Sequence, residues 1–341
     1  MQEIILVTGA TGFIAQQLII DLLEAGHRVR GTIRDLSKSD ALLQTLSNHT
    51  DKANDLDLYQ ADLETDEGWA EAIKGTSCVQ HVASPFPLRI PKDPEDLIRP
   101  AKQGVLRVLK LAKKEGVKRV VMTSSCAAIA YKSDDPLPSV LTEDDWSDAH
   151  DARACPPYPA SKTLAERAAW EYIEGEGKGL ELVAINPVGV FGPIRSADVR
   201  TSVGVVQQML SGGVPAMPRM GLQFCDVRDV SAMHIKAMET PEAVGNRYAV
   251  ASEFLYMEDV ANVLREAFPD FASKLPTRIL PSFLVRLLAP FSEDAKVASY
   301  EIGKHRYVSP KKGEDLLGRS FIDAREALIE SAQTLIRYEA V

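Results

Sequence analysis

The sequence predicts an α/β protein, with a Rossmann-type, doubly wound parallel sheet and a smaller, mixed, helix-rich C-terminal lobe. Short apolar runs alternate with helix-length segments over the first 190 residues, a pattern typical of parallel strands joined by crossover helices. A glycine-rich turn directly follows the first run. The length of 341 residues exceeds the size at which a single core stops growing, which favours a second lobe.

Six strands are predicted from apolar runs that end at turn-forming or polar residues. In chain order they occupy residues 3–7, 28–33, 56–60, 78–82, 119–123 and 180–185. Apolar residues at helical spacing predict helices between them, including residues 13–25, 97–115 and 161–173. Each crossover can therefore place a helix against one face of the sheet.

The regular alternation loosens after Pro193, where prolines become frequent. An apolar run at 224–227 and a helix-like segment at 228–238 are the exception, because they can return to the sheet. We therefore expect a dinucleotide-binding Rossmann domain and a substrate-binding lobe, the first made of residues 1–190 plus about 222–240, the second of about 191–221 and 241–341.

The acidic composition argues against several classes of partner. Lysine and arginine number 39 against 48 acidic residues, a net charge of −9, so attraction to nucleic-acid phosphates or anionic lipid is disfavoured. No stretch reaches the roughly 18 consecutive apolar residues that suggest a membrane helix. The N-terminus shows neither the basic region nor the cleavage site of a secretory signal. We therefore expect a cytoplasmic protein without nucleic-acid or membrane partners.

The four cysteines and six histidines lack the spacing of a metal site. No CxxC, HxxxH or HxH pattern occurs among them. Scattered cysteines suit reduced thiols in a cytosol. We expect no metal, and a small molecule as the partner.

The first turn carries two glycines three residues apart, Gly9 and Gly12. Glycine lets the backbone turn sharply and approach a pyrophosphate, whose charge is met by the free N–H groups of the following helix. The turn follows the first strand and opens the first helix, which is the context that this motif requires. We predict that Gly9, Thr11, Gly12, Phe13 and Ile14 contact a dinucleotide.

The end of the second strand indicates which dinucleotide binds. An acid there bonds the ribose hydroxyls of NAD, whereas a cation accommodates the extra phosphate of NADP. Arg34 follows the strand and Lys38 is nearby, so NADP(H) is favoured, with the neighbouring Asp35 as a counter-indication. The alternative is a solvated surface arginine.

The third and fourth strands also end in residues that can line a cofactor site. Ligands of open α/β sheets collect at the carboxyl ends of the strands. Asp62 can accept from an adenine amino group, or it can serve as a helix N-cap. The cofactor contacts predicted at these two ends are Asp62, Leu63, Val82, Ala83 and Ser84.

A tyrosine and a lysine four residues apart, Tyr158 and Lys162, follow the fifth strand, which ends at Ser124 and Ser125. On a helix the two side chains share one face, so the ammonium can lower the phenol pKa from its usual value of about 10. Such a phenol can donate a proton near neutrality. We therefore predict general acid chemistry at Tyr158.

Two other pairs in the chain have the same spacing. They are Tyr300 with Lys304 and Tyr307 with Lys311. The first contains Gly303 and the second Pro310, both unfavourable in a helix, and neither follows a serine-bearing strand end. Position therefore favours Tyr158 and Lys162.

Taken together, the motifs resemble the extended short-chain dehydrogenase/reductase family. They are TGATGFIA, Asp62-Leu63, TSS, YPASK and INPVGVFGP, in this order over residues 1 to about 255. Within the family the chain is most similar to the branch of dihydroflavonol reductases, cinnamoyl-CoA reductases and microbial carbonyl reductases.

The resemblance implies roles for individual residues. Tyr158 would be the general acid, Lys162 would lower its pKa and bond the nicotinamide ribose, and Ser125, rather than Ser124, would hold the substrate carbonyl. Further cofactor contacts implied by the family are Pro187 with its neighbouring backbone, Val190 and Ser202.

The resemblance also implies an NADPH-dependent reductase that converts a carbonyl into a chiral alcohol. Apolar segments at 85–88, 126–131 and 215–224 suit the walls of a pocket for an aromatic or alicyclic ketone or aldehyde. Phe86, Ala130 and Tyr158 are the expected substrate contacts. Ala130 stands where flavonoid reductases have an asparagine-like residue, which argues against dihydroflavonol itself.

Two other functions share this fold. One is an NAD-dependent nucleotide-sugar epimerase or dehydratase, which Arg34 disfavours; the other is a catalytically silent sensor of NADP(H). The oligomeric state is left open between monomer and homodimer, since the predicted helices 97–115 and 161–173 can pair across a dimer or remain solvated.

Overall fold

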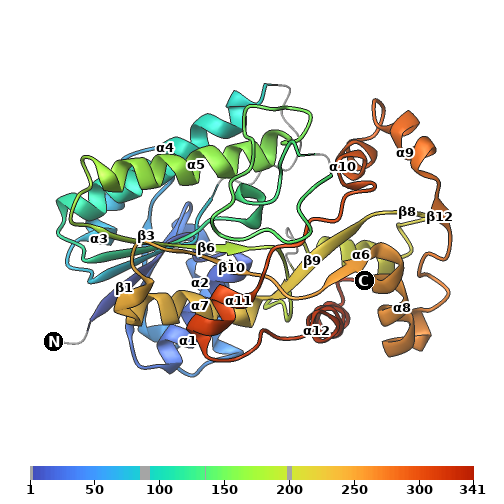
Figure 1. Ribbon diagram of the computed structural model, residues 1–341. Coiled ribbons are helices and arrows are strands. Elements are labelled where there is room, and N and C mark those ends of the chain that lie inside the picture. Colours follow the sequence, from blue (N-terminus) through green and yellow to red (C-terminus); the bar gives the residue numbers. More distant parts are fainter. Residues whose placement is uncertain (1–2, 85–92, 135, 198–201) are drawn as a thin grey trace.

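A seven-stranded parallel sheet forms the centre of the structure, a computed structural model that describes residues 3–84, 93–134, 136–197 and 202–341 (Figure 1). Its strand order is β10-β6-β5-β4-β1-β2-β3, and every neighbouring pair is parallel. The strands are β1 (Ile4–Val7), β2 (Arg28–Ile33), β3 (Leu56–Gln60), β4 (Cys78–His81), β5 (Arg119–Thr123), β6 (Glu181–Pro187) and β10 (Arg247–Val250). All six predicted strands are present, and the predicted fold class is confirmed.

Helices cover both faces of this sheet (Figure 1). The helices on one face pack apolar residues onto Leu6, Val79, Val120 and Leu182; they are α3 (Trp69–Ile73), α4 (Glu95–Lys114) and α5 (Pro157–Glu174). The opposite face is covered by α1 (Phe13–Glu24), α2 (Ser39–Ser47), α7 (Val227–Glu239) and α11 (Lys311–Leu317). Burial on both faces explains why the strands read as continuous apolar runs.

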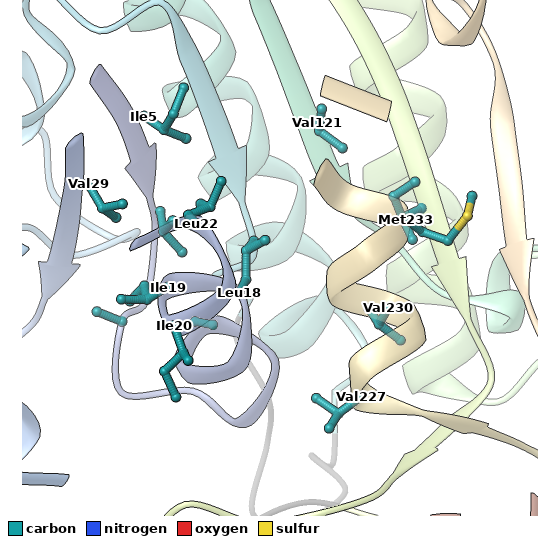
Figure 2. Packing of buried hydrophobic residues seen from close by; sticks show 14 of the residues in the cluster. Ile5, Leu18, Ile19, Ile20, Leu22, Val29, Val121, Val227, Val230 and Met233 are labelled. Carbon is teal, nitrogen blue, oxygen red and sulfur yellow. The ribbon is translucent and has the colours of Figure 1, made fainter. Parts of the chain in front are cut away.

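The core between α1, α7 and the sheet is a layer of aliphatic side chains. Figure 2 shows Leu18 and Leu22 of α1 and Val230 of α7 in one cluster with Ile5 and other strand residues. Leu18 and Leu22 are one helical turn apart and fully buried, as expected for the inward face of a helix. This packing holds the start of α1 at the carboxyl end of β1.

The rest of the chain forms smaller layers beside the large sheet (Figure 1). A three-stranded sheet has the order β11-β9-β7, and a two-stranded sheet pairs β12 with β8. The strands are β7 (Gly189–Phe191), β8 (Met217–Pro218), β9 (Gly221–Asp226), β11 (Phe254–Tyr256) and β12 (Ile279–Leu280). The accompanying helices are α6 (Gly204–Leu210), α8 (Met257–Ala267), α9 (Ser282–Leu288), α10 (Glu293–Glu301) and α12 (Ala324–Arg337).

The prediction that 224–227 returns to the large sheet is wrong for the strand. Residues 221–226 form β9 of the small sheet, and Asp226 caps α7 by accepting a hydrogen bond from the N–H of Arg228. The following helix α7 does pack on the large sheet. The seventh strand is β10, which pairs with β6 although it lies within the range 241–341 assigned to the lobe.

Helix α5 begins earlier than predicted, at Pro157 instead of residue 161. A proline at the first helical position is favourable, because its missing N–H has no partner within a helix start and its φ is already helical. Tyr158 therefore lies in the first turn of α5 and Lys162 one turn later. None of the helices in the described ranges combines the length and the apolar character needed to cross a membrane.

Candidate active site

The strand order places the candidate site at the carboxyl edge of the large sheet. The order reverses between β1 and β4, and ligands of open α/β sheets bind outside such a switch point. The glycine turn follows β1, Ser84 follows β4, and Ser125 follows β5. The start of α5, with Tyr158, lies at the same edge, because Lys162 in the second turn of this helix donates to Ser84.

The glycine turn packs closely against the end of β4 and leads into an uncapped helix start. Gly9 has φ +70°, and a Cβ there would lie 3.0 Å from the Cβ of Ala83. The N–H of Ala83 donates to Thr8 Oγ1 at 2.9 Å, which ties the ends of β1 and β4 together. Helix α1 starts at Phe13 with Gly12 as its N-cap, without a side-chain cap and without an acid in its first turn, so its N-terminal N–H groups are available to an anion.

The other predicted residues of this turn lie around the start of α1. Thr11 is exposed, whereas Phe13 and Ile14 are half-buried and pack against the core below. The turn therefore fits the pyrophosphate of a dinucleotide on the basis of its backbone. Contact of these three side chains with a cofactor stays a prediction.

Arg34 and Lys38 are both exposed beyond the end of β2. Within the described ranges, Arg34 makes no side-chain hydrogen bond or ion pair. Asp35 has a local structural role, because its carboxylate accepts a hydrogen bond from the N–H of Ser37 at 3.0 Å and caps a short 3-10 helix. Hydrogen bonding from the side chain of Ser37, and next from its N–H, holds the pKa of Asp35 below its usual value. Asp35, which counted against NADP(H), is thus hydrogen-bonded to Ser37, and the exposed Arg34 beside it can bind a phosphate.

Asp62 and Leu63 follow β3 and are half-buried. The alternative reading of Asp62 as a helix N-cap is wrong, because α3 begins at Trp69 after Gly68. Its carboxylate instead accepts from the N–H of Glu64 within a turn, and its carbonyl accepts from the indole of Trp69 at 2.7 Å. Contact of Asp62 or Leu63 with an adenine stays a prediction.

Lys162 is nearly buried and its ammonium donates to Ser84 Oγ at 2.6 Å. Burial lowers the pKa of Lys162 to about 8. A cavity of about 20 Å³, room for one ordered water, is lined by both residues and by His81. Burial and the charge of Lys162 lower the pKa of His81 to about 4, so this histidine is neutral at physiological pH.

Ser125 lies close enough to Tyr158 for its hydroxyl to favour the phenolate and to oppose the rise in the Tyr158 pKa. Ser125 Oγ accepts from the N–H of Ala127 at 3.0 Å, which leaves the serine proton to donate to the phenol oxygen. Lys162 Nζ lies 5.7 Å from the centre of the Tyr158 ring. The predicted residues Ser125, Tyr158 and Lys162 are therefore brought together.

The expected effect of Lys162 on the phenol is not observed in this arrangement. Burial raises the pKa of Tyr158, and the hydrogen bond with Ser125 opposes that rise. Lys162 lies over the ring and its hydrogen bond goes to Ser84, which explains why its charge does not dominate the phenol pKa. Tyr158 is thus held as a protonated phenol, able to donate.

The two competing tyrosine–lysine pairs do not share a helix face. Helix α10 ends at Glu301, and Gly303 has φ +75°, so Lys304 lies beyond the helix that carries Tyr300. Helix α11 begins at Lys311, so Tyr307 precedes it. Among these three pairs, Tyr158 and Lys162 alone lie on one helix, and their catalytic role stays a prediction.

Other predicted contacts are less clearly placed at the site. Pro187 and Val190 are buried at and beyond the end of β6, and Ser202 precedes α6. Ala130 is 5% exposed and packs in a small apolar cluster. Phe86 and the rest of segment 85–88 lie outside the described residues.

A larger pocket of about 360 Å³ lies in the lobe, lined by residues that include Met217, Met220, Tyr256, Met257 and Ile279. It involves part of the segment 215–224 that was predicted to form a pocket wall. Tyr158 is not among the described residues that line this pocket, so its use as the substrate pocket stays a prediction.

Several polar residues around the site were missed by sequence reasoning. Tyr131 belongs to the predicted wall segment 126–131, but its partner was not predicted: its hydroxyl donates to Glu301 of α10 at 2.9 Å, and burial followed by the charge of Glu301 raises the pKa of Tyr131. Glu166 and Arg247 form a buried ion pair behind the catalytic turn. Glu166 lies one turn beyond Lys162 on α5, a spacing visible in the sequence, but nothing local identifies Arg247 as its partner.

Comparisons with known proteins agree with these features. The NAD dependent epimerase/dehydratase family matches residues 5–251. Cinnamoyl-CoA reductase 1 of Petunia hybrida is 37% identical over 278 residues, 81% of this chain and 80% of the relative. A putative NADPH-dependent methylglyoxal reductase of Candida albicans is 30% identical over 351 residues, 97% of this chain and 98% of the relative.

A solved structure is similar over nearly the whole chain. The yeast methylglyoxal/isovaleraldehyde reductase Gre2, complexed with NADPH, has a TM-score of 0.81 and 29% identity, covering 98% of this chain and 99% of that chain. The resemblance to extended short-chain dehydrogenases/reductases that the motifs indicate is thus confirmed. From the match over residues 5–251 and these relatives, the chain belongs to the NAD dependent epimerase/dehydratase family.

Proposed function

We propose that this protein is an NADPH-dependent reductase that converts the carbonyl of a hydrophobic ketone or aldehyde into a chiral alcohol. The observation that carries the proposal is the convergence of Ser125, Tyr158 and Lys162 at one edge of the large sheet, with Lys162 Nζ 5.7 Å from the centre of the Tyr158 ring. The trio lies at the sheet edge that also holds the uncapped start of α1. Relatives named for NADPH and for aldehyde or cinnamoyl-CoA reduction support the same reaction class.

In this reaction the protein residues bind the carbonyl oxygen and supply its proton. When bound, NADPH supplies the hydride that reduces the carbonyl carbon. Ser125 and Tyr158 donate hydrogen bonds to the carbonyl oxygen, and Tyr158 transfers its proton as negative charge develops there. Lys162, while charged, stabilises the phenolate that Tyr158 becomes, and it gains a strong electrostatic contact only at that stage.

The residues available for the cofactor fit the dinucleotide. The glycine turn and the start of α1 would hold the pyrophosphate, and Lys162 would exchange its bond with Ser84 for one to the nicotinamide ribose. Arg34 would bind the 2′-phosphate, which distinguishes NADPH from NADH. The exposed guanidinium is suited to a bidentate contact of this kind.

Replacing Arg34 by leucine is expected to weaken NADPH binding about 10- to 100-fold, the value of one charge-assisted contact of about 1.5–3 kcal/mol. Binding of NADH should change less than about twofold, since NADH lacks the 2′-phosphate. Arg28→Leu is the control, because Arg28 lies at the other end of β2 and is also exposed. Fluorescence titration measures both affinities; equal losses for the two cofactors would contradict the assignment.

The proposed reaction is tested by adding a panel of aromatic and alicyclic ketones and aldehydes to the purified protein with NADPH, and separately with NADH. We expect loss of the reduced-cofactor absorbance with NADPH in preference to NADH, and a chiral alcohol as product. If NAD co-purifies and no carbonyl consumes reduced cofactor, the nucleotide-sugar epimerase or dehydratase reading replaces this proposal.

A further inference from the structure

A buried ion pair lies directly behind the catalytic turn. Glu166 on α5 is 0% exposed and Arg247 at the start of β10 is 7% exposed. Arg247 Nε donates to Glu166 Oε1 at 2.6 Å. Two charges in such a place are costly to desolvate, so replacing either partner alone leaves a buried charge without compensation.

Glu166 connects this ion pair to the turn that carries Ser125. Its Oε2 accepts from the hydroxyl of Ser124 at 2.5 Å and from Asn186 Nδ2 at 2.8 Å. The same Asn186 amide donates to the carbonyl of Ser125 at 3.1 Å. Ser124 therefore binds the Glu166 carboxylate directly, and the backbone of Ser125 is linked to the same carboxylate through Asn186.

Arg247 connects the pair to the loops on the other side of the turn. Its Nη1 donates to the carbonyls of Glu143 and Asp145, both at 2.8 Å. Its guanidinium lies 3.7 Å from the centre of the Trp146 ring. Strand β10 thereby holds the loop that packs beside the serine turn.

We propose that Glu166 and Arg247 are positioning residues, which hold Ser125 against the start of α5 so that its hydroxyl stays in register with the hydroxyl of Tyr158. Neither residue touches the reacting atoms; both act through Ser125. This inference rests on the proposed carbonyl reduction. It predicts a loss in turnover, because a misplaced donor affects a contact that strengthens in the transition state.

A second Arg–Glu pair, at the amino ends of β5 and β6, provides a control away from the catalytic edge; its glutamate is less buried than Glu166. Arg119 at the start of β5 pairs with Glu181 at the start of β6, with Nε to Oε2 at 2.7 Å. Arg119 is 5% exposed and also donates to carbonyls at the end of α7. Glu181→Gln therefore perturbs another Arg–Glu pair of the large sheet without touching the catalytic edge.

Replacing Glu166 by glutamine is expected to lower kcat at least tenfold with the carbonyl substrate found in the panel. The Kd of the Glu166→Gln variant for NADPH should differ from that of the wild type by less than about twofold. Glu181→Gln should change kcat less than about twofold, even where the loss of thermal stability is similar. Steady-state kinetics measures kcat, fluorescence titration measures the Kd for NADPH, and thermal unfolding measures stability.

A double-mutant cycle separates positioning from general stabilisation. If Glu166 acts through Ser125, the Glu166→Gln change should lower kcat much less in a Ser125→Ala background than in the wild type. Should Glu166→Gln fail to fold, Ser124→Ala removes only the bond from the turn to the carboxylate, and should still lower kcat several-fold in the same cycle.

The results distinguish this inference from the proposed function. Equal kcat losses in Glu166→Gln and Glu181→Gln, or an unchanged effect in the Ser125→Ala background, would overturn the positioning role alone. A wild-type protein that reduces no carbonyl would overturn the proposed function, and the positioning role with it.

Discussion

Replacing Tyr158 by phenylalanine is expected to lower kcat for carbonyl reduction by about 10²- to 10⁴-fold, the usual contribution of a positioned general acid. The change removes the hydroxyl that is bonded to Ser125 and leaves the buried ring. NADPH affinity should therefore stay within about twofold of the wild type. Steady-state kinetics with the panel substrate and fluorescence titration of NADPH measure the two effects.

The control for this experiment is Tyr300→Phe. Tyr300 also has a lysine four residues later, but it lies on α10, which ends before that lysine. The kcat of the Tyr300→Phe variant should remain within about twofold of the wild type. Near-full turnover of the Tyr158 variant would refute general acid catalysis by this residue.

Replacing Lys162 by methionine is expected to lower kcat/KM by about 10²- to 10³-fold, as for the removal of one stabilising donor at a developing charge.

The same Lys162→Met variant should be more stable than the wild type at pH 7. Burial lowers the pKa of Lys162 from 10.5 to about 8, which means that burying the charged ammonium reduces the free energy of unfolding. The gain in unfolding free energy is at most about 3 kcal/mol.

The pH dependence of this gain follows from the direction of the pKa shift. Below pH 8 the ammonium is charged in both the folded and the unfolded state, and the folded protein bears the full cost of burial. Between pH 8 and 10.5 the folded state releases the proton first, so the wild type gains stability relative to the variant as pH rises. The difference between the two proteins should therefore be largest below pH 8 and vanish above pH 10.5.

Urea unfolding of both proteins at several pH values measures this difference. Lys110→Met on α4 is the control, because Lys110 is exposed and should change stability by less than about 0.5 kcal/mol. A Lys162 variant that is less stable than the wild type at pH 7 would contradict the cost assigned to the buried ammonium.

These two variants together test a trade-off between stability and activity. Catalytic groups are often held in environments that destabilise the folded protein. Tyr158 and Lys162 lie side by side on α5, yet we expect opposite changes in stability from them. Removal of the phenol hydroxyl loses a hydrogen bond, whereas removal of the ammonium relieves a desolvation cost.

The sequence by itself determined the features that depend on neighbouring residues. The strands β1 to β6 follow from continuous apolar runs, the glycine turn from the backbone freedom of Gly9, and the shared helix face of Tyr158 and Lys162 from the period of 3.6 residues. These features are local, and they are enough to indicate the fold class and the catalytic pair.

Only the tertiary structure decided which distant residues meet. It placed β10 rather than β9 in the large sheet, brought Ser84 to Lys162, and paired Glu166 with Arg247. It also reversed the expected direction of the Tyr158 pKa, since burial depends on everything that packs around the phenol. Such pairings and burial are set by the packing of the whole chain, which no local pattern encodes.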